Sequence, residues 1–181
     1  MKTNQILKGG VALALSVMIF TGCSSNTNKE NESAEAGSKS TVVEQATPVQ
    51  FADQKVGTVY EHYNHVKNAL VEGNAAETQA GASALQTALI DAGNSKGADL
   101  AGKIASVSDV EAQRAEFEAL TAEVESVIRS SKMDGGVIYK QYCPMANGNK
   151  GAYWLSSESG IKNPYFGDKM LECGETKEEI K

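Results

Sequence analysis

The feature that most restricts the fold is a helical spacing of apolar side chains within residues 49–130. In its first part, residues that recur every three or four positions are Val56, Val59, Tyr60, Tyr63, Val66 and Leu70. This spacing predicts a helix with one buried stripe. Gly73 and Asn74 mark its end, and Asn74 with Glu77 three residues later predicts the N-terminus of a second helix.

The same pattern continues through the rest of this region. Residues 75–92 predict an Ala-rich helix, and a Gly/Asn/Ser break at 93–97 precedes a short helix over 98–105. Ser108 and Glu111 form a capping-box pair that opens a long helix. Its apolar stripe consists of Val110, Phe117, Leu120, Val124, Val127 and Ile128. Three to four helices with short connections predict an antiparallel bundle, so the fold class is mainly α.

Residues 1–22 have the pattern of a lipoprotein signal peptide and are not expected to belong to the fold. Lys2 and Lys8 flank the start of an apolar run, residues 11–20, that is too short to span about 30 Å of hydrocarbon. The run ends in Phe-Thr-Gly-Cys, which resembles the lipobox where bacterial lipoproteins are cleaved and lipidated. We therefore expect a lipid anchor on Cys23, and the alternative is an ordinary signal peptide with an incidental cysteine.

The stretch that follows, residues 23–48, is expected to be the lipidated cysteine and a flexible tether. It is rich in Ser, Asn and Glu and has no aromatic residue. The folded domain would then be residues 49–181, in the oxidising, extracytoplasmic cell envelope, on the periplasmic or outer-membrane face. Loss of Lys2 and Lys8 would leave 15 basic against 23 acidic residues, a net charge of −8. That charge argues against a nucleic-acid partner.

The scarce residues of the chain gather in a C-terminal motif region, residues 137–174. Residues 137–139 and 151–155 are β-prone and flank a polar turn, which predicts a short hairpin beside irregular chain. The region holds the only tryptophan, Trp154, and four of the six tyrosines. Two Cys–Met pairs occur there in mirrored order, and they are Cys143 with Met145 and Met170 with Cys173.

These sulfur residues allow two kinds of chemistry. Thiolates and thioethers are soft donors that select Cu(I) over Zn(II), Ca(II) or Mg(II), and helical spacing would place Met170 and Cys173 on one face. In an oxidising compartment, Cys143 and Cys173 would instead form a disulfide that closes a loop of about 30 residues, worth roughly 3–4 kcal/mol. His62 and His65 are weaker candidate ligands, and solvated surface histidines are the alternative.

The sequence contains no grouping of residues typical of nucleophilic catalysis. It has no Cys-x-x-Cys pair for thiol exchange and no nucleophile elbow. No histidine lies near Cys143 or Cys173 along the chain. We therefore expect a binding protein and not an enzyme.

The C-terminal motifs resemble the signature of the DUF3347 family. They are YCPMA at 142–146, WLS at 154–156, NPYFG at 163–167, and Met170-Leu171 with Cys173-Gly174, with weaker helical matches at Tyr63, Gln113-Arg114 and Phe117. The resemblance covers residues 49–180. The family is functionally uncharacterised, and its domain occurs alone in bacterial lipoproteins and fused to periplasmic adaptor subunits of copper/silver-type efflux pumps.

The resemblance implies soft-metal chemistry. We expect a membrane-anchored lipoprotein that binds Cu(I) or Ag(I) for buffering or for transfer to an efflux or metal-transfer partner. Its ligands would be Cys143, Met145, Met170 and Cys173. Trp154 would cover the ion by cation–π attraction, and residues 163–167 would form the turn that positions Met170 and Cys173. The alternative is a non-metal interaction module of the envelope with a structural Cys143–Cys173 disulfide.

Overall fold

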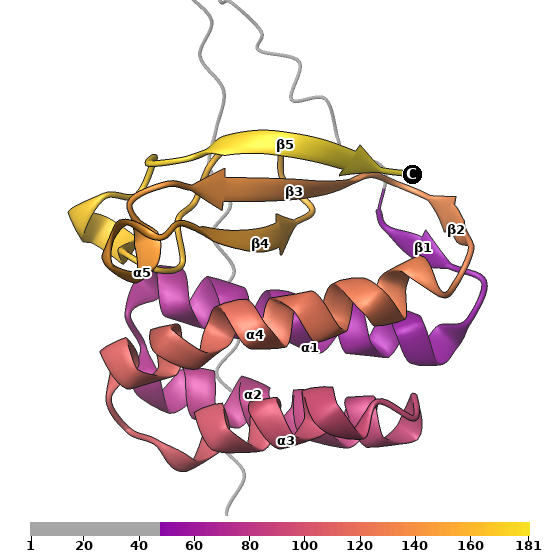
Figure 1. Cartoon of the computed structure of the whole chain (residues 1–181). Coiled ribbons are helices and arrows are strands. Elements are labelled where there is room, and N and C mark those ends of the chain that lie inside the picture. Colours follow the sequence, from indigo (N-terminus) through magenta and orange to yellow (C-terminus); the bar gives the residue numbers. More distant parts are fainter. Residues whose placement is uncertain (1–47) are drawn as a thin grey trace, which may run out of the picture. The chain divides into compact units, whose positions relative to one another are not determined.

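A computed structural model describes residues 48–181 of the chain, so the predicted signal peptide, Cys23 and all but the last residue of the predicted tether lie outside the described residues. Four helices, α1 (Gln54–Glu72), α2 (Ala75–Asp91), α3 (Ser95–Ser106) and α4 (Val110–Arg129), form an antiparallel bundle (Figure 1). The mainly α fold class is thus confirmed. Within the described part, none of the helices has the length and apolarity needed to cross a membrane.

The first helix follows the sequence prediction closely. Every residue of the predicted stripe on α1 is at most 4 % exposed. Gly73 ends α1 in the left-handed conformation, at φ 68°, which glycine adopts without steric cost. The Asn74 side chain then accepts a hydrogen bond from the Glu77 amide, so the predicted start of α2 is confirmed.

The next two helix starts differ from the prediction. Asn94 accepts a hydrogen bond from the Gly97 amide, and this cap begins α3 at Ser95, three residues earlier than expected. The cap of α4 is Asp109, which accepts from the Ala112 amide at 2.8 Å. The predicted Ser108–Glu111 capping box is therefore wrong by one residue.

The C-terminal region contains the predicted hairpin and one strand that the sequence did not reveal. Strands β3 (Ile138–Cys143) and β4 (Ala152–Ser156) pair antiparallel, and the turn between them includes α5 (Ala146–Asn149). Strand β5 (Glu175–Ile180) pairs with the other edge of β3, so the strand order is β4-β3-β5. Five of its six side chains are exposed, which explains why no alternating apolar pattern marks it.

A second, smaller sheet ties the start of the described chain to the end of the bundle. Strand β1 (Gln50–Phe51) pairs antiparallel with β2 (Met133–Gly135). The expectation that the helical pattern begins at residue 49 is therefore wrong, because α1 starts only at Gln54. Phe51 packs edge-on against Tyr60 of α1, at 5.9 Å between ring centroids.

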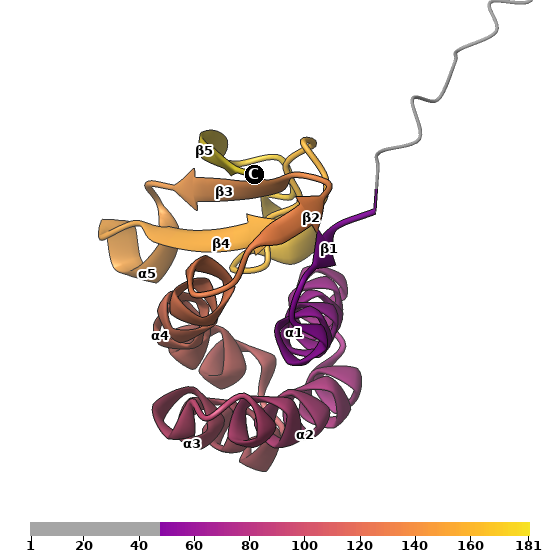
Figure 2. The ribbon, with the colours of Figure 1, turned by 90° about the vertical axis from the view of Figure 1, so that its right-hand side faces the viewer.

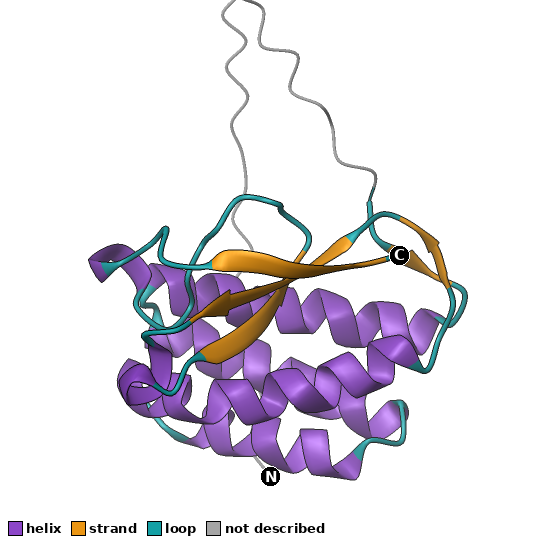
Figure 3. Ribbon diagram, turned by 45° about the horizontal axis from the view of Figure 1, so that its top comes forward, coloured by secondary structure: helices purple, strands orange, loops and turns teal. Residues whose placement is uncertain are grey.

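The sheet lies over α1 and α4, while α2 and α3 form the layer farther from it (Figures 2 and 3). Strand β4 is the strand next to the helices, and tyrosine hydroxyls satisfy the edge of β4 that does not pair with β3. The Leu155 amide donates to Tyr63 Oη at 3.0 Å, and Tyr165 Oη donates to the Tyr153 carbonyl at 2.6 Å. An edge that would otherwise carry unpaired backbone groups is thus closed against the bundle.

Candidate functional site

The register of the three-stranded sheet brings the two cysteines together. Tyr142 of β3 pairs with Glu175 of β5, so the chain just before β5 runs beside Cys143 at the end of β3. The Cys143 and Cys173 sulfur atoms lie 2.9 Å apart, and both residues are free thiols. Cys143 is fully buried and Cys173 is partly buried. The sequence paired these residues as ligands or as a disulfide, and either chemistry requires the two side chains to be neighbours.

A glycine and an asparagine hold the second thiol in place. Gly174 has φ +148°, and a Cβ there would lie 2.8 Å from Trp154 Cη2, so only glycine lets the chain after Cys173 approach the indole. Asn163 is fully buried and donates from Nδ2 to the Cys173 carbonyl at 2.7 Å. Its Oδ1 accepts from the Tyr165 amide at 2.8 Å. The turn at 163–167 therefore does position Cys173.

The thiols influence each other electrostatically. The pKa of the Cys173 thiol is raised, first by its hydrogen bond with Cys143 and then by burial. Cys173 is therefore held as a neutral thiol more firmly than a free cysteine. A metal ion bound by its thiolate would have to displace that proton.

The two methionines are arranged differently from the thiols. Met145 is 46 % exposed and lines a shallow cavity of about 410 Å³ whose lining includes Asn147 and Phe166 but neither cysteine. Met170 is partly buried, and its carbonyl accepts from the Cys173 amide at 3.1 Å. Met170 and Cys173 lie in a turn after the short 3₁₀ helix η1 (Gly167–Lys169), so the helical spacing predicted for this pair is wrong.

Trp154 is a core residue. It is fully buried, pairs across the sheet with Gln141, and packs edge-on against Tyr165 at 6.1 Å between ring centroids. Alternation along β3 puts Gln141 and Cys143 on one face, so Trp154 lies on the same face as the buried thiol. Its role as a cation–π cover stays a prediction.

The two histidines have different surroundings. His65 Nε2 lies 2.6 Å from Glu77 Oε1, which links α1 to α2 on the surface. His62 is partly exposed on α1. Across residues 48–181, no three His, Cys, Asp or Glu side chains form a group that could hold a metal ion.

Two buried polar residues, Lys67 and Gln141, were not predicted from the sequence. Lys67 on α1 is 2 % exposed, and burial lowers its pKa although the charge of Glu158 opposes the shift. Gln141 is fully buried and donates from Nε2 to the Glu158 carbonyl at 3.0 Å, which fastens the loop after β4 to β3. The burial of Lys67 could have been predicted, because it lies four residues after Tyr63 and therefore on the same apolar stripe of the helix.

The comparisons with known proteins identify the helical region. The family model described as "Protein of unknown function (DUF3347)" matches residues 59–135, from α1 to β2. The matched stretch leaves out the sulfur-rich segment, although that segment carried most of the resemblance in sequence. No curated protein and no solved structure matches the chain. The match over residues 59–135 supports the resemblance of the chain to the DUF3347 family.

Proposed function

We propose that the chain is an extracytoplasmic lipoprotein, anchored through Cys23, that binds Cu(I) or Ag(I) and buffers it or transfers it to an efflux or metal-transfer partner. The observation that supports the proposal is the 2.9 Å separation of the Cys143 and Cys173 sulfurs. Two thiolates form a soft donor pair of the kind that Cu(I) prefers. Met145 and Met170 are additional ligands in this proposal, and Trp154 is the cover.

Metal binding at this pair requires the sulfurs to separate. Thiolates lie about 2.3 Å from a shared metal such as zinc, so sulfurs 2.9 Å apart would demand a strongly bent S–metal–S angle. Cys143 is fixed by the pairing of β3 with Ala152 of β4, whereas Cys173 lies in a turn before β5. We therefore expect Cys173 to be the ligand that moves when an ion enters.

Protons compete with the metal at this site. Because its hydrogen bond with Cys143 raises the pKa of the Cys173 thiol, ion binding releases a proton. The apparent affinity should consequently increase with pH across the range in which the free thiols are protonated. An affinity independent of pH would speak against thiolate ligation.

The direct test is competition between the reduced full-length chain and a Cu(I)-selective chelator. All variants carry Cys23→Ser, so that the third thiol cannot bind the ion. Cys143→Ser or Cys173→Ser should abolish competition, while Met145→Leu and Met170→Leu should each weaken it. Met133→Leu, in β2, is the matched control and should have no effect. Failure of the parent to compete, or full binding by both serine variants, would refute the proposal.

The anchor is tested separately in cells. Metabolic labelling with a radioactive fatty acid should mark the exported protein, and Cys23→Ser should remove the label. Label retained in the serine variant would rule out Cys23 as the lipidation site. This result has no bearing on the chelator competition.

A second function, an interaction module of the envelope, is favoured by the same sulfur separation together with one further observation. The thiols need only a small closure to bond, and an oxidant of the thiol–disulfide exchange class would take one proton and one electron from each. On the sheet, Tyr142 and Tyr153 pack with ring centroids 4.6 Å apart, and Lys140 Nζ lies 4.9 Å from the Tyr153 centroid. Tyr153 is 37 % exposed, so this aromatic pair is available for contact.

Mass spectrometry of the exported protein under non-reducing conditions separates the two functions. A complete disulfide that resists mild reduction favours the interaction module. Free thiols, or a mass increase equal to a copper ion, favour metal binding. Tyr153→Ala is a useful companion, because it should leave chelator competition unchanged while altering the aromatic surface.

A further inference from the structure

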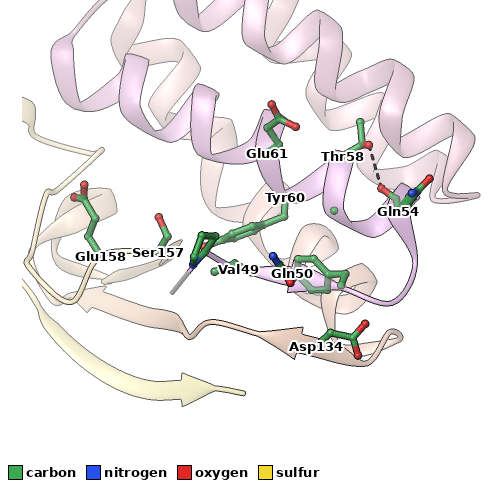
Figure 4. Close-up of a pocket in the computed structure, with 12 residues that line it drawn as sticks. Val49, Gln50, Gln54, Thr58, Tyr60, Glu61, Asp134, Ser157 and Glu158 are labelled. Carbon is green, nitrogen blue, oxygen red and sulfur yellow. Dashed lines mark hydrogen bonds between the residues drawn. The ribbon is translucent and has the colours of Figure 1, made fainter. Parts of the chain in front are cut away.

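A groove on the opposite side of α1 from α2 has no role in either proposed function. It lies between β1, the first half of α1, Asp134 of β2, and the residues that follow β4 (Figure 4). Its volume is about 870 Å³, within the range typical of small-molecule sites. Neither cysteine is among its lining residues.

The lining of the groove carries negative charge only. Of its twelve residues, three are carboxylates, Glu61, Asp134 and Glu158, and none is Lys, Arg or His. Glu61 is exposed and makes no ion pair within residues 48–181. Of the other two, Glu158 also feels the charge of the buried Lys67. Both form ion pairs with solvent-exposed lysines from outside the lining, at 3.4 Å for Lys132–Asp134 and 2.8 Å for Lys162–Glu158. Exposed pairs of this kind contribute little, so a bound cation can replace them.

A buried hydroxyl gives an independent indication of a ligand. Tyr60 is 4 % exposed, yet its Oη has no hydrogen-bond partner in the described chain. Asn64 and Ser157 lie close enough to this oxygen to lower its pKa slightly against the effect of burial, but neither contact has the geometry of a hydrogen bond. The side chain extends from α1 into the groove toward Ser157 and Val49 (Figure 4). An unpaired buried hydroxyl costs about 1–3 kcal/mol, a loss that a polar ligand would recover.

The protonation state of Tyr60 defines what it can bind. Burial raises the pKa of Tyr60 to about 12, so the hydroxyl is neutral under physiological conditions. A neutral hydroxyl oxygen accepts hydrogen bonds from an ammonium group. Its ring, packed edge-on with Phe51, adds an apolar wall beside that acceptor.

We propose that this groove binds a linear aliphatic polyamine. The carboxylates do not form a group that could hold one metal ion in the described chain, so their charge is spread along the groove. A polyamine carries several separated ammonium groups, which match carboxylates spread in this way. Its methylene segments would lie along Phe51 and Tyr60, and one ammonium would donate to Tyr60 Oη.

The test is calorimetric titration of the full-length chain with spermidine at about 0.15 M salt, where exposed charges more than about 8 Å apart are largely screened. We expect one spermidine per chain, bound more tightly than Mg²⁺. Tyr60→Phe should weaken binding about tenfold through the lost hydrogen bond to a charged group. Glu61→Gln should weaken it about threefold.

The controls keep the result interpretable. Glu72→Gln removes an exposed carboxylate from the far end of α1, outside the groove, and should leave spermidine affinity unchanged. Glu61 is exposed, so its substitution tests the groove even if Tyr60→Phe disturbs folding. Binding no tighter than Mg²⁺, or equal losses for Glu61→Gln and Glu72→Gln, would overturn the proposal. Cys143→Ser should bind spermidine normally, so this test is independent of the metal site.

Discussion

The helical bundle and the C-terminal sheet are packed in different ways. In the bundle, α1 and α4 bury evenly spaced apolar side chains, and Tyr63 stacks on Phe117 at 5.3 Å between ring centroids. In the sheet region, individual buried amides and hydroxyls bind backbone groups, as Asn163 does at Cys173 and Gln141 does at Glu158. The bundle therefore depends on summed apolar area, whereas the sheet depends on a few directional contacts, each of which can be removed singly.

The largest effect should come from the bundle side. Phe117 is fully buried and contacts both Tyr63 and Tyr165, so Phe117→Ala leaves a cavity beneath the sheet. We expect a loss of about 3–5 kcal/mol in the free energy of unfolding, measured by urea denaturation. Ile90→Ala, at a position 61 % exposed, is the control and should change stability by less than about 0.5 kcal/mol. A loss for Phe117→Ala no larger than the control's would contradict this account of the core.

Asn163→Ala should act on the sheet region alone. It removes the acceptor of the Tyr165 amide and the donor to the Cys173 carbonyl. We expect the free energy of unfolding to fall by about 2–3 kcal/mol. Hydrogen exchange should show reduced protection at β5, with α2 and α3 unchanged. Asn68→Ala, at an exposed position of α1, should have no such effect. Equal loss of protection in α2 would mean that the two regions unfold as one unit.

Tyr63→Phe tests the contact between the regions. The ring and its stacking remain, but the Leu155 amide loses its partner, and so does Thr121, whose hydroxyl lies 2.8 Å from Tyr63 Oη. We expect the free energy of unfolding to fall by about 1–2 kcal/mol and the hydrogen exchange of the Leu155 amide to become faster. Tyr139→Phe, at a partly buried position on β3, serves as the control. An unchanged exchange rate at Leu155 would show that this edge of β4 is protected by other means.

Lys67→Met should give the smallest change in the free energy of unfolding, and it should increase that free energy where the other substitutions lower it. Burial lowers the pKa of Lys67, which means that this site, only 2 % exposed, disfavours the charged amine. Replacing it with a thioether of similar length should stabilise the protein by on the order of 1 kcal/mol.

The pH dependence provides a check on the same residue. The unfolded lysine binds its proton more tightly than the folded one, so stability of the parent should increase as pH rises from the lowered folded value to the unfolded value near 10.5. Lys67→Met should lack this increase. A parent stability that is flat over that interval would show that the amine is not destabilised by burial.

Periodicity made the bundle predictable. The stripe on α1, the end at Gly73 and the cap at Asn74 depend only on neighbours in sequence, which is why all three are confirmed. The turn between β3 and β4 was predictable for the same reason. The cap of α4 was placed one residue early because Ser108 and Asp109 are both favoured capping residues. The start of α3 was placed three residues late because residues 93–97 were interpreted as a break, whereas Asn94 caps the helix there.

The sulfur site depended on information that local patterns do not carry. Strand β5 is marked by backbone pairing and not by apolar alternation, and its register with β3 decides where Cys173 lies. The approach also needs Gly174, whose role follows from its contact with Trp154, twenty residues away in sequence. Spacing could name Cys143 and Cys173 as partners, but the 2.9 Å contact required the folded sheet.

The two edges of the three-stranded sheet are protected in different ways, and together they limit the sheet to three strands. On the inner edge, hydroxyl groups occupy the backbone sites where another strand would bind. On the outer edge, β5 presents exposed charged side chains, among them Glu175, Lys177 and Glu179. Charged residues on an edge strand discourage pairing with a second chain. Copies of this domain concentrated at one surface should therefore remain separate and resist assembly into continuous β-structure.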